Sequence, residues 1–222
     1  MKTYLILLIL IFIIPFLFSF EKKLYFIKNL KHVVKSIIVV AIPYLIWDEF
    51  FTSNKIWGFS DEHIIGLKIF DLPLEEILFF VVVPYALIFL FEVFNFYIKD
   101  KIIVIKIFLL IFLAAIFLIL AIIFHIKIYT AIQFFLTSLF FSSVYHFKWK
   151  ILFRRNFWVL ILFSFIPFFI INYFLTSIPV VWYNENEIIG LRILSIPIED
   201  LFYHFTLTSF YILAYNYFKS KK

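Results

Sequence analysis

The chain lacks cysteine altogether and holds only three glycines among its 222 residues. Without cysteine there can be no disulfide, no thiolate metal site and no cysteine nucleophile. No G-x-G-x-x-G sequence occurs either, so we expect no bound flavin or nicotinamide. These absences favour a site that uses neither a cofactor nor a metal.

Charge is also scarce: charged residues make up 15% of the chain and hydrophobic residues 65%, including 35 phenylalanines. The mean hydropathy is +1.09. Apolar runs long enough to cross a bilayer recur along the chain, which predicts an all-α integral membrane protein. The net charge of +6 resides in short loops between these runs. It is better explained by orientation in the membrane than by a nucleic-acid partner.

The apolar runs predict seven transmembrane helices, since each crossing needs about 20 residues. We expect them at 3–20, 33–51, 72–97, 102–125, 128–147, 157–176 and 196–218. The first run is interpreted as a retained span, because no small-residue cleavage site follows it. Pro43 and Pro167 fall inside two of these helices and are expected to kink them.

Basic residues predict the orientation of these helices. Fifteen of the 20 Lys and Arg residues fall in loops 1–2, 3–4 and 5–6 and in the C-terminal tail. Such loops usually face the cytoplasm. We therefore expect a multi-pass protein of the cell membrane with its N-terminus outside and its C-terminus in the cytoplasm.

A sequence repeat divides the chain. Residues 64–76, IIGLKIFDLPLEE, return at residues 188–200 as IIGLRILSIPIED, with an offset of 124 and no gap. We expect two parallel three-helix repeats, residues 1–99 and 127–222, joined by a linking helix in residues 100–126. Binding sites in such folds tend to form between repeats.

Each repeat carries an acid pair at a predicted helix start: Glu75 and Glu76 in the first, Glu199 and Asp200 in the second. A structural explanation is available, because acids complement a helix N-terminus and Asp71 and Ser195 could act as N-caps. A catalytic explanation is a general acid, since burial favours the neutral carboxyl. Adjacent helix positions lie about 100° apart, so one acid of each pair can face the bundle interior.

Residues around the acids suit a positive charge. Aromatic faces stabilise cations, and the candidate binding aromatics are Trp47, Trp57, Phe79, Trp182 and Tyr203. An aromatic belt at the membrane interface would explain the same residues. His204 lies four residues after Asp200 and could hold its charge or act as a base. Asp48 is a further candidate acid, and its counterpart in the second repeat is Asn172.

Four segments resemble the integral-membrane lycopene cyclase family, in its form with two fused homologous domains. They are Trp47-Asp48, Ile56-Trp57-Gly58, Pro73-Leu74-Glu75-Glu76 with Phe79, and Pro197-Ile198-Glu199-Asp200 with Phe202-Tyr203. The resemblance implies cyclisation of the ends of lycopene to β-ionone rings, giving β-carotene. Its motif acids carry over to Glu75, Glu76, Glu199 and Asp200.

The implied reaction begins when an acid protonates the terminal C1=C2 bond of lycopene. The C5=C6 bond then closes on the cation, and a base removes a proton from C6. Lycopene would reach the site from the membrane lipid, and other enzymes of the carotenoid pathway are candidate partners.

Other classes of membrane protein are possible alternatives. A retinal protein needs a lysine inside its last helix, and residues 196–218 contain none. A prenyltransferase would need an aspartate-rich cluster, which the chain lacks. A proton, ion or small-molecule transporter using the intramembrane acids is the main alternative, and a purely structural scaffold is another.

Overall fold

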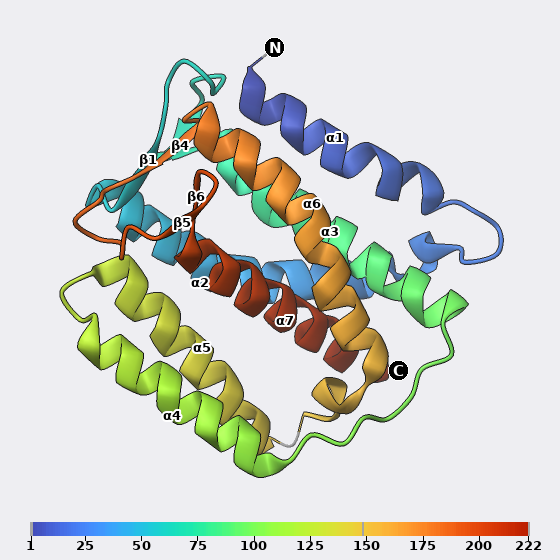
Figure 1. The fold of residues 1–222 in the computed structure, drawn as a ribbon. Helices are drawn as coiled ribbons and strands as arrows, with labels where there is room; N and C mark the ends of the chain where they lie inside the picture. Colours follow the sequence, from blue (N-terminus) through green and yellow to red (C-terminus); the bar gives the residue numbers. More distant parts are fainter. Residues whose placement is uncertain (1, 148, 222) are drawn as a thin grey trace.

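A computed structural model describes residues 2–147 and 149–221. Lys148 and Lys222, two of the fifteen basic residues that predict the orientation, lie outside the described residues. The described chain is largely α-helical (Figure 1). Its α-helices are α1 (Thr3–Phe18), α2 (Leu30–Ser53), α3 (Leu74–Tyr97), α4 (Ile107–Ile123), α5 (Ile128–Phe147), α6 (Arg155–Ser177) and α7 (Ile198–Ser220). Two short 3-10 helices, η1 (Phe26–Asn29) and η2 (Lys150–Phe153), precede α2 and α6.

The helices agree with the apolar runs in number and closely in position. The largest difference is at α4, which begins at Ile107 rather than at residue 102. Both α2 and α6 continue through their internal prolines, Pro43 and Pro167. The sequence did not predict the six short strands of the described residues, which form two-stranded antiparallel pairs.

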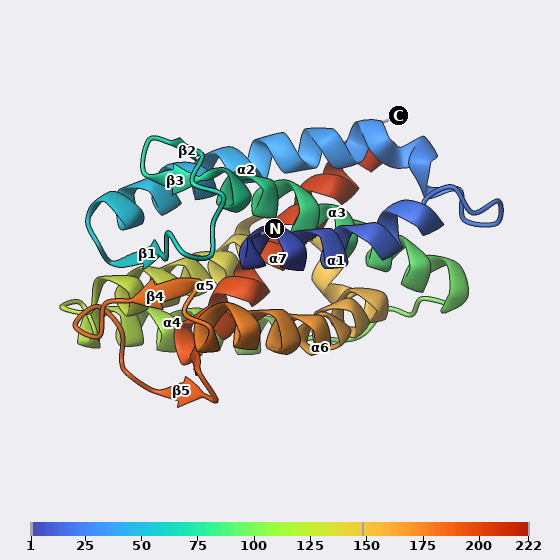
Figure 2. The ribbon, with the colours of Figure 1, turned by 90° about the horizontal axis from the view of Figure 1, so that it is seen from above.

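These strands are β1 (Trp57–Phe59) with β4 (Val181–Tyr183), β2 (Lys68–Ile69) with β3 (Leu72–Pro73), and β5 (Arg192–Ile193) with β6 (Ile196–Pro197). Figures 1 and 2 show them gathered at one end of the helix bundle. Helices α3 and α7 begin there, so the strands surround the helix starts that carry the acid motif.

Helix α7 is the centre of the bundle. It packs against α2, α3, α5 and α6, while α4 packs on α5 and α1 packs on α3. Figure 1 shows α1 on one side of the bundle and the α4–α5 hairpin on the other. The inward side of α7 is unusually polar for an apolar bundle, with Thr206, Thr208 and Ser209 all fully buried.

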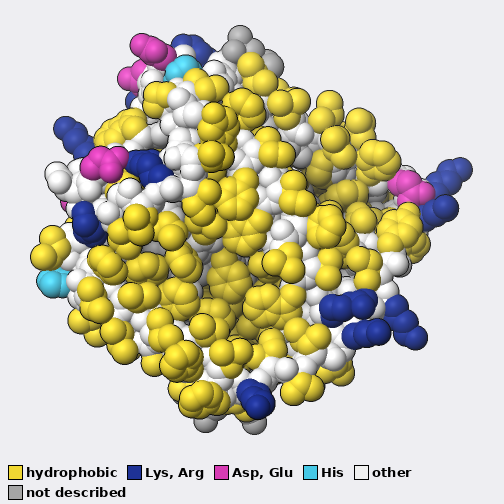
Figure 3. Space-filling view, in the orientation of Figure 1, with side chains coloured by type: hydrophobic (Ala, Val, Ile, Leu, Met, Phe, Trp, Pro, Cys, Tyr) yellow, Lys and Arg dark blue, Asp and Glu magenta, His cyan; other side chains and the backbone are white. Residues whose placement is uncertain are grey.

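The outer surface of the bundle is hydrophobic. Figure 3 shows apolar side chains across most of one face, with charged side chains near its edges. Phe108 on α4 and Leu17 on α1, for example, are 75% and 62% exposed. An apolar surface of this extent is unfavourable in water and suits a lipid environment.

Within residues 2–147 and 149–221, three helical segments are long and apolar enough to cross a membrane: Phe26–Ser53, Leu74–Tyr97 and Arg155–Ser177. Together with the apolar surface, they indicate membrane association. The shorter apolar helices Thr3–Phe18 and Ile107–Ile123 fall below the length of a span by themselves. The count of seven spans and the orientation remain predictions.

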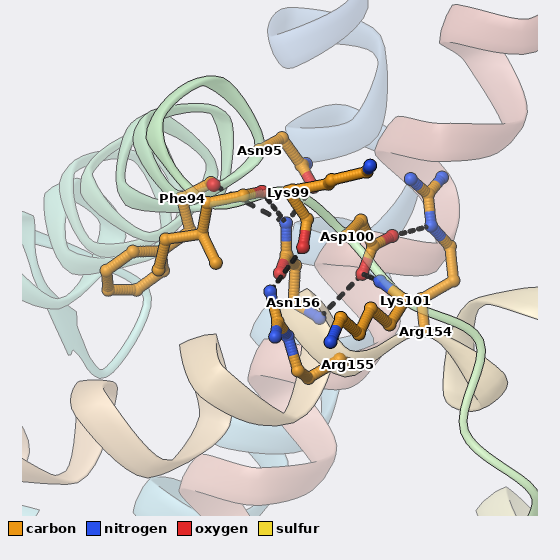
Figure 4. A network of polar contacts seen from close by, with 9 residues as sticks. Phe94, Asn95, Lys99, Asp100, Lys101, Arg154, Arg155 and Asn156 are labelled. Atoms are coloured by element: carbon orange, nitrogen blue, oxygen red, sulfur yellow. Dashed lines mark hydrogen bonds and ion pairs between the residues drawn. The ribbon is translucent and has the colours of Figure 1, made fainter.

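A polar clasp joins the end of α3 to the start of α6 (Figure 4). The side-chain amide of Asn156 donates hydrogen bonds to the carbonyls of Phe94 and Ile98 and to Asn95 Oδ1, at 3.4, 2.9 and 3.2 Å. Asp100 accepts from the Asn156 backbone N–H at 3.0 Å and from Arg154 Nε. The clasp gives the Ile98 carbonyl, at the end of α3, a donor that the helix itself does not supply.

Candidate active site

A hairpin and a tight loop lead into each motif helix. Gly66 and Gly190 have φ of +89° and +86°, a left-handed conformation that glycine adopts without strain. The loop then folds back, and the first N–H of each helix donates to it, Leu74 to the Leu67 carbonyl and Ile198 to that of Leu191. The two loops at offset 124 therefore have the same local structure.

The prediction that Asp71 and Ser195 act as N-caps is wrong. Each lies in the turn of its hairpin, two residues before the helix boundary, and the N-cap positions belong to Pro73 and Pro197. The Ser195 hydroxyl pairs instead with Thr176 Oγ1 at 2.7 Å. The hairpin places these residues two positions before the N-cap, and neither helix start has a side-chain cap hydrogen bond among the described residues.

The first acid of each pair holds its own loop. Glu75 accepts a hydrogen bond from the Ile65 N–H at 2.6 Å, and Glu199 accepts one from the Ile189 N–H at 2.8 Å. Both side chains are fully buried, and Thr130 Oγ1 on α5 also donates to Glu199. Neither acid lines the cavity that the second acid of each pair faces, so this geometry fits a positioning role.

The second acid of each pair faces one shared cavity. Glu76 on α3 and Asp200 on α7 both line a cavity of about 460 Å³, and Asp48 on α2 lines it as well. All three are buried. The 100° step between neighbouring helix positions thus separates a loop-binding acid from a cavity acid in both copies.

Asp48 and Glu76 form a carboxyl pair. Both line the same cavity, from the packed helices α2 and α3. Trp57 Nε1 donates to Asp48 Oδ1 at 2.7 Å, and the Tyr4 hydroxyl on α1 donates to Glu76 Oε2. None of the described residues that line the cavity is a lysine or arginine, and two buried carboxyls in such a cavity disfavour double ionisation.

Asp200 has a different environment from that pair. Its Oδ1 accepts a hydrogen bond from the Tyr129 hydroxyl at 2.6 Å, and its Oδ2 accepts from Tyr183 at 2.8 Å and from Asn172 Nδ2 at 3.2 Å. Burial raises the pKa of Tyr183 well above its ordinary value, and the charge of Asp200 raises it further. The Tyr183 hydroxyl therefore remains a donor to this carboxylate.

The β1–β4 pair positions donors on both acid groups. Its register sets Trp57 opposite Tyr183 and Gly58 opposite Trp182. Trp57 bonds to Asp48, and Tyr183 bonds to Asp200. One small sheet thus couples the geometry of the Asp48–Glu76 side to that of the Asp200 side.

The predicted binding aromatics divide into three groups. Trp57, Phe79 and Tyr203 line the cavity. Trp47 does not line it but packs behind Trp57 and Tyr203, with ring centroids 5.9 and 5.4 Å away. Trp182 lies against Gly58, is 38% exposed and does not line the cavity.

His204 lines the cavity, but its hydrogen-bond partner is Ser164 rather than the expected Asp200. Its Nε2 lies 2.8 Å from the Ser164 hydroxyl on α6, and its ring stacks on Phe168 at 4.5 Å between centroids. Among the described residues no hydrogen bond joins it to Asp200. His204 does not contact Asp200, one turn earlier on α7, because its ring packs against Ser164 and Phe168 on α6.

Sequence reasoning missed the tyrosines that hold the cavity acids, Tyr4, Tyr129 and Tyr183. Each comes from an element that is distant in sequence from the acid it contacts, by 72, 71 and 17 positions. One signal was present in the sequence for Tyr183. The segments Trp57-Gly58-Phe59 and Val181-Trp182-Tyr183 are 124 residues apart, the same offset as the acid motifs.

Away from the acids the cavity wall is apolar. It consists of side chains from α1, α3 and α6, such as Leu10, Ile14, Val83, Leu90 and Ile170. Leu10, Ile14 and Ile170 are each more than half exposed on the outer surface. The cavity is therefore a hydrophobic chamber whose wall reaches the lipid-facing surface and whose polar groups cluster near the strands.

The chain is thus a helical, membrane-associated protein with a cluster of buried acids in an apolar chamber. The sequence model of a family described as lycopene cyclase matches residues 1–94 and 126–218. The chain therefore belongs to the lycopene cyclase family, and the resemblance inferred from the acid motifs is confirmed.

Curated relatives share shorter segments with the chain. A bifunctional lycopene cyclase/phytoene synthase of Leptosphaeria maculans is 48% identical over 48 residues, 22% of this chain and 8% of that protein. Those of Neurospora crassa and Arthroderma gypseum are 30% and 28% identical over 74 residues. These two matches cover 32% and 33% of this chain and 12% of each relative. No solved structure is significantly similar to the chain.

Proposed function

We propose that this protein is a lycopene β-cyclase that converts the ends of lycopene to β-ionone rings and so forms β-carotene. The observation that carries the proposal is the cavity: a chamber of about 460 Å³ with largely apolar walls and three buried acids near the strands. Family membership supports the substrate class, and the curated relatives carry lycopene cyclase in their names.

The reaction requires what the cavity offers. Protonation of the C1=C2 bond at C2 leaves a cation at C1, and the C5=C6 bond attacks it to close the ring. The cation then lies at C5, and loss of the C6 proton forms the ring double bond. Atoms and electrons balance, because one proton enters and one leaves.

The cavity walls suit each stage of this sequence. Apolar walls exclude water, which would otherwise capture the carbocation. The rings of Trp57, Phe79 and Tyr203 line the chamber, where aromatic faces stabilise positive charge by about 0.5–2 kcal/mol each. The exposed lining residues Leu10, Ile14 and Ile170 offer a route for a lipid-soluble polyene between α1 and α6.

A transporter is less well supported by the same cavity. Transport needs polar groups through the depth of the bundle. Here the acids gather at one end, and the wall beyond them is formed by residues such as Val83, Ala86 and Leu90. The proposal also places the protein in the cell membrane with seven spans, two parallel repeats, an external N-terminus and a cytoplasmic C-terminus.

The test is expression in cells that accumulate lycopene, followed by chromatography of the pigments. We expect lycopene to be consumed and β-carotene to appear. Glu185→Gln serves as a control, because Glu185 is exposed and pairs with Arg192 outside the cavity. If lycopene persists although the wild-type protein is present in the membrane, the proposal is wrong.

A further inference from the structure

The two acid groups in the cavity differ in their hydrogen-bond partners, and this difference assigns their roles. We propose that the Asp48–Glu76 pair donates the proton that starts cyclisation, and that Asp200 is the base that removes the C6 proton. The inference rests on the proposed function and deepens it, because the family motif alone does not distinguish donor from base.

The Asp48–Glu76 pair suits a donor because one of the two carboxyls must carry a proton. Both are buried, at 2% and 8% exposure, and both line the cavity from the packed helices α2 and α3. Among the described residues that line the cavity, none is a lysine or arginine. Two negative charges in one low-dielectric cavity would repel strongly, so the stable form holds a proton on one of the two carboxyls.

Asp200 suits a base because its partners favour the ionised form. It accepts three hydrogen bonds, and one donor is the Asn172 amide, whose NH₂ group has no acceptor function. Hydrogen bonds to a carboxylate stabilise the charged form, and with two or three donors this effect is large. A protonated Asp200 would leave one of these donors facing an O–H group.

The Asp48/Asn172 difference between the repeats then has a chemical meaning. Both residues lie at matched positions on α2 and α6 and both face the acid of the adjoining motif helix. In the first repeat Asp48 is a second carboxyl beside Glu76, and the two together retain a proton. In the second repeat the Asn172 amide donates a hydrogen bond to Asp200, which remains ionised. A single acid-to-amide change between the copies thus separates a donor from a base.

Three tyrosines act as positioning residues in this scheme. Tyr4 holds Glu76, whereas Tyr129 and Tyr183 hold Asp200. Removing a hydroxyl from Tyr4 affects proton delivery, and removing one from Tyr129 or Tyr183 affects proton removal. These variants keep the aromatic ring and therefore most of the packing.

The product identity separates the two steps in an experiment. Without proton delivery no carbocation forms, and lycopene persists. Without the base the C5 cation still forms and must lose a different proton, from C4 or from the C5 methyl group, or be captured by water. A base variant therefore changes the ring type, whereas a donor variant reduces the consumption of lycopene.

The experiment measures lycopene consumption and ring type by chromatography and mass spectrometry in lycopene-accumulating cells. We expect Glu76→Gln and Asp48→Asn to lower consumption by about 100-fold or more. Glu49→Gln is the matched control, because Glu49 neighbours Asp48 on α2 but does not line the cavity. Asp200→Asn is expected to keep measurable consumption while β-rings fall from the main product to a minority.

The tyrosine variants keep the test decisive if Asp200→Asn reduces the amount of folded protein. Tyr129→Phe and Tyr183→Phe should shift the ring type, and Tyr4→Phe should slow consumption while the rings remain β. If wild type is active but Asp200→Asn and both of its tyrosine variants only slow β-ring formation, the assignment is wrong. If wild type is inactive, the proposed function itself fails.

Discussion

The contact between Gly58 and Trp182 makes Gly58→Ala an informative perturbation of the site. A Cβ at residue 58 would lie 2.4 Å from Trp182 Cζ2 and 2.6 Å from Cε2. Carbon atoms prefer about 3.5–4.0 Å, so the indole would have to move by roughly 1 Å. Overpacking of this kind typically costs about 1–3 kcal/mol.

The cost would reach the site through the β1–β4 sheet. Trp57 and Tyr183 face each other in the next pair of the register and hold Asp48 and Asp200 at 2.7 and 2.8 Å. A displacement of about 1 Å near reacting groups can lower a rate by about 100-fold. We expect Gly58→Ala to reduce cyclisation by about 10- to 100-fold, measured as lycopene consumption per amount of membrane protein.

A second substitution distinguishes this explanation from a general loss of folding. The obstruction is the side chain of Trp182, which is 38% exposed and does not line the cavity. Trp182→Ala alone should be mild, and Gly58→Ala combined with Trp182→Ala should recover most of the activity. Full activity of Gly58→Ala, or no recovery in the double variant, would refute the reasoning.

The remaining predictions concern the clasp and the membrane topology. Asn156→Ala should lower the free energy of unfolding by about 1–3 kcal/mol, because the part-buried Ile98 carbonyl and Asn95 Oδ1 lose their donor. Thermal unfolding in detergent measures this, and an unchanged midpoint would contradict it. Asp100 has a lowered pKa despite partial burial, because the Asn156 N–H and Arg154 stabilise its carboxylate. The contribution of Asp100 to the free energy of unfolding is fully present above the ordinary carboxyl pKa of 3.8 and is lost as the pH falls through the lower pKa of the folded state. Wild type and Asp100→Asn should therefore converge in stability in acid. Asn186→Cys, the only cysteine in that variant, should react with an impermeant thiol reagent from outside intact cells, and labelling only from the cytoplasmic side would contradict the orientation.

The helices could be predicted from the sequence because long apolar runs determine them locally. The acid motifs were also visible, since they occur twice at one offset. The cavity geometry was less accessible: strand pairing between β1 and β4 joins three-residue segments more than 120 positions apart and leaves no local periodicity. Which acid faces the cavity depends on where the helix begins, and the hairpin sets that boundary at Pro73 and Pro197.

The hydrogen-bond donors on the acids were the least predictable part. Tyr4 and Tyr129 stand in apolar runs where a tyrosine is as readily explained by the membrane interface. Their function follows only from tertiary packing of α1 on α3 and of α5 on α7. His204 shows the converse, because helical spacing suggested Asp200 as its partner, whereas packing against α6 provides Ser164.

The shared cavity has a consequence for how the chain is assembled. Asp48 and Glu76 arrive on the segment before α4, and Asp200 arrives on the segment after it. Neither segment alone encloses the chamber, so separate halves would have to meet in one-to-one stoichiometry before the two acid groups faced one cavity. A covalent connection makes that meeting intramolecular, at an effective concentration of about millimolar. Because α4 and its loops join the two halves in one chain, the halves are always produced in equal amounts.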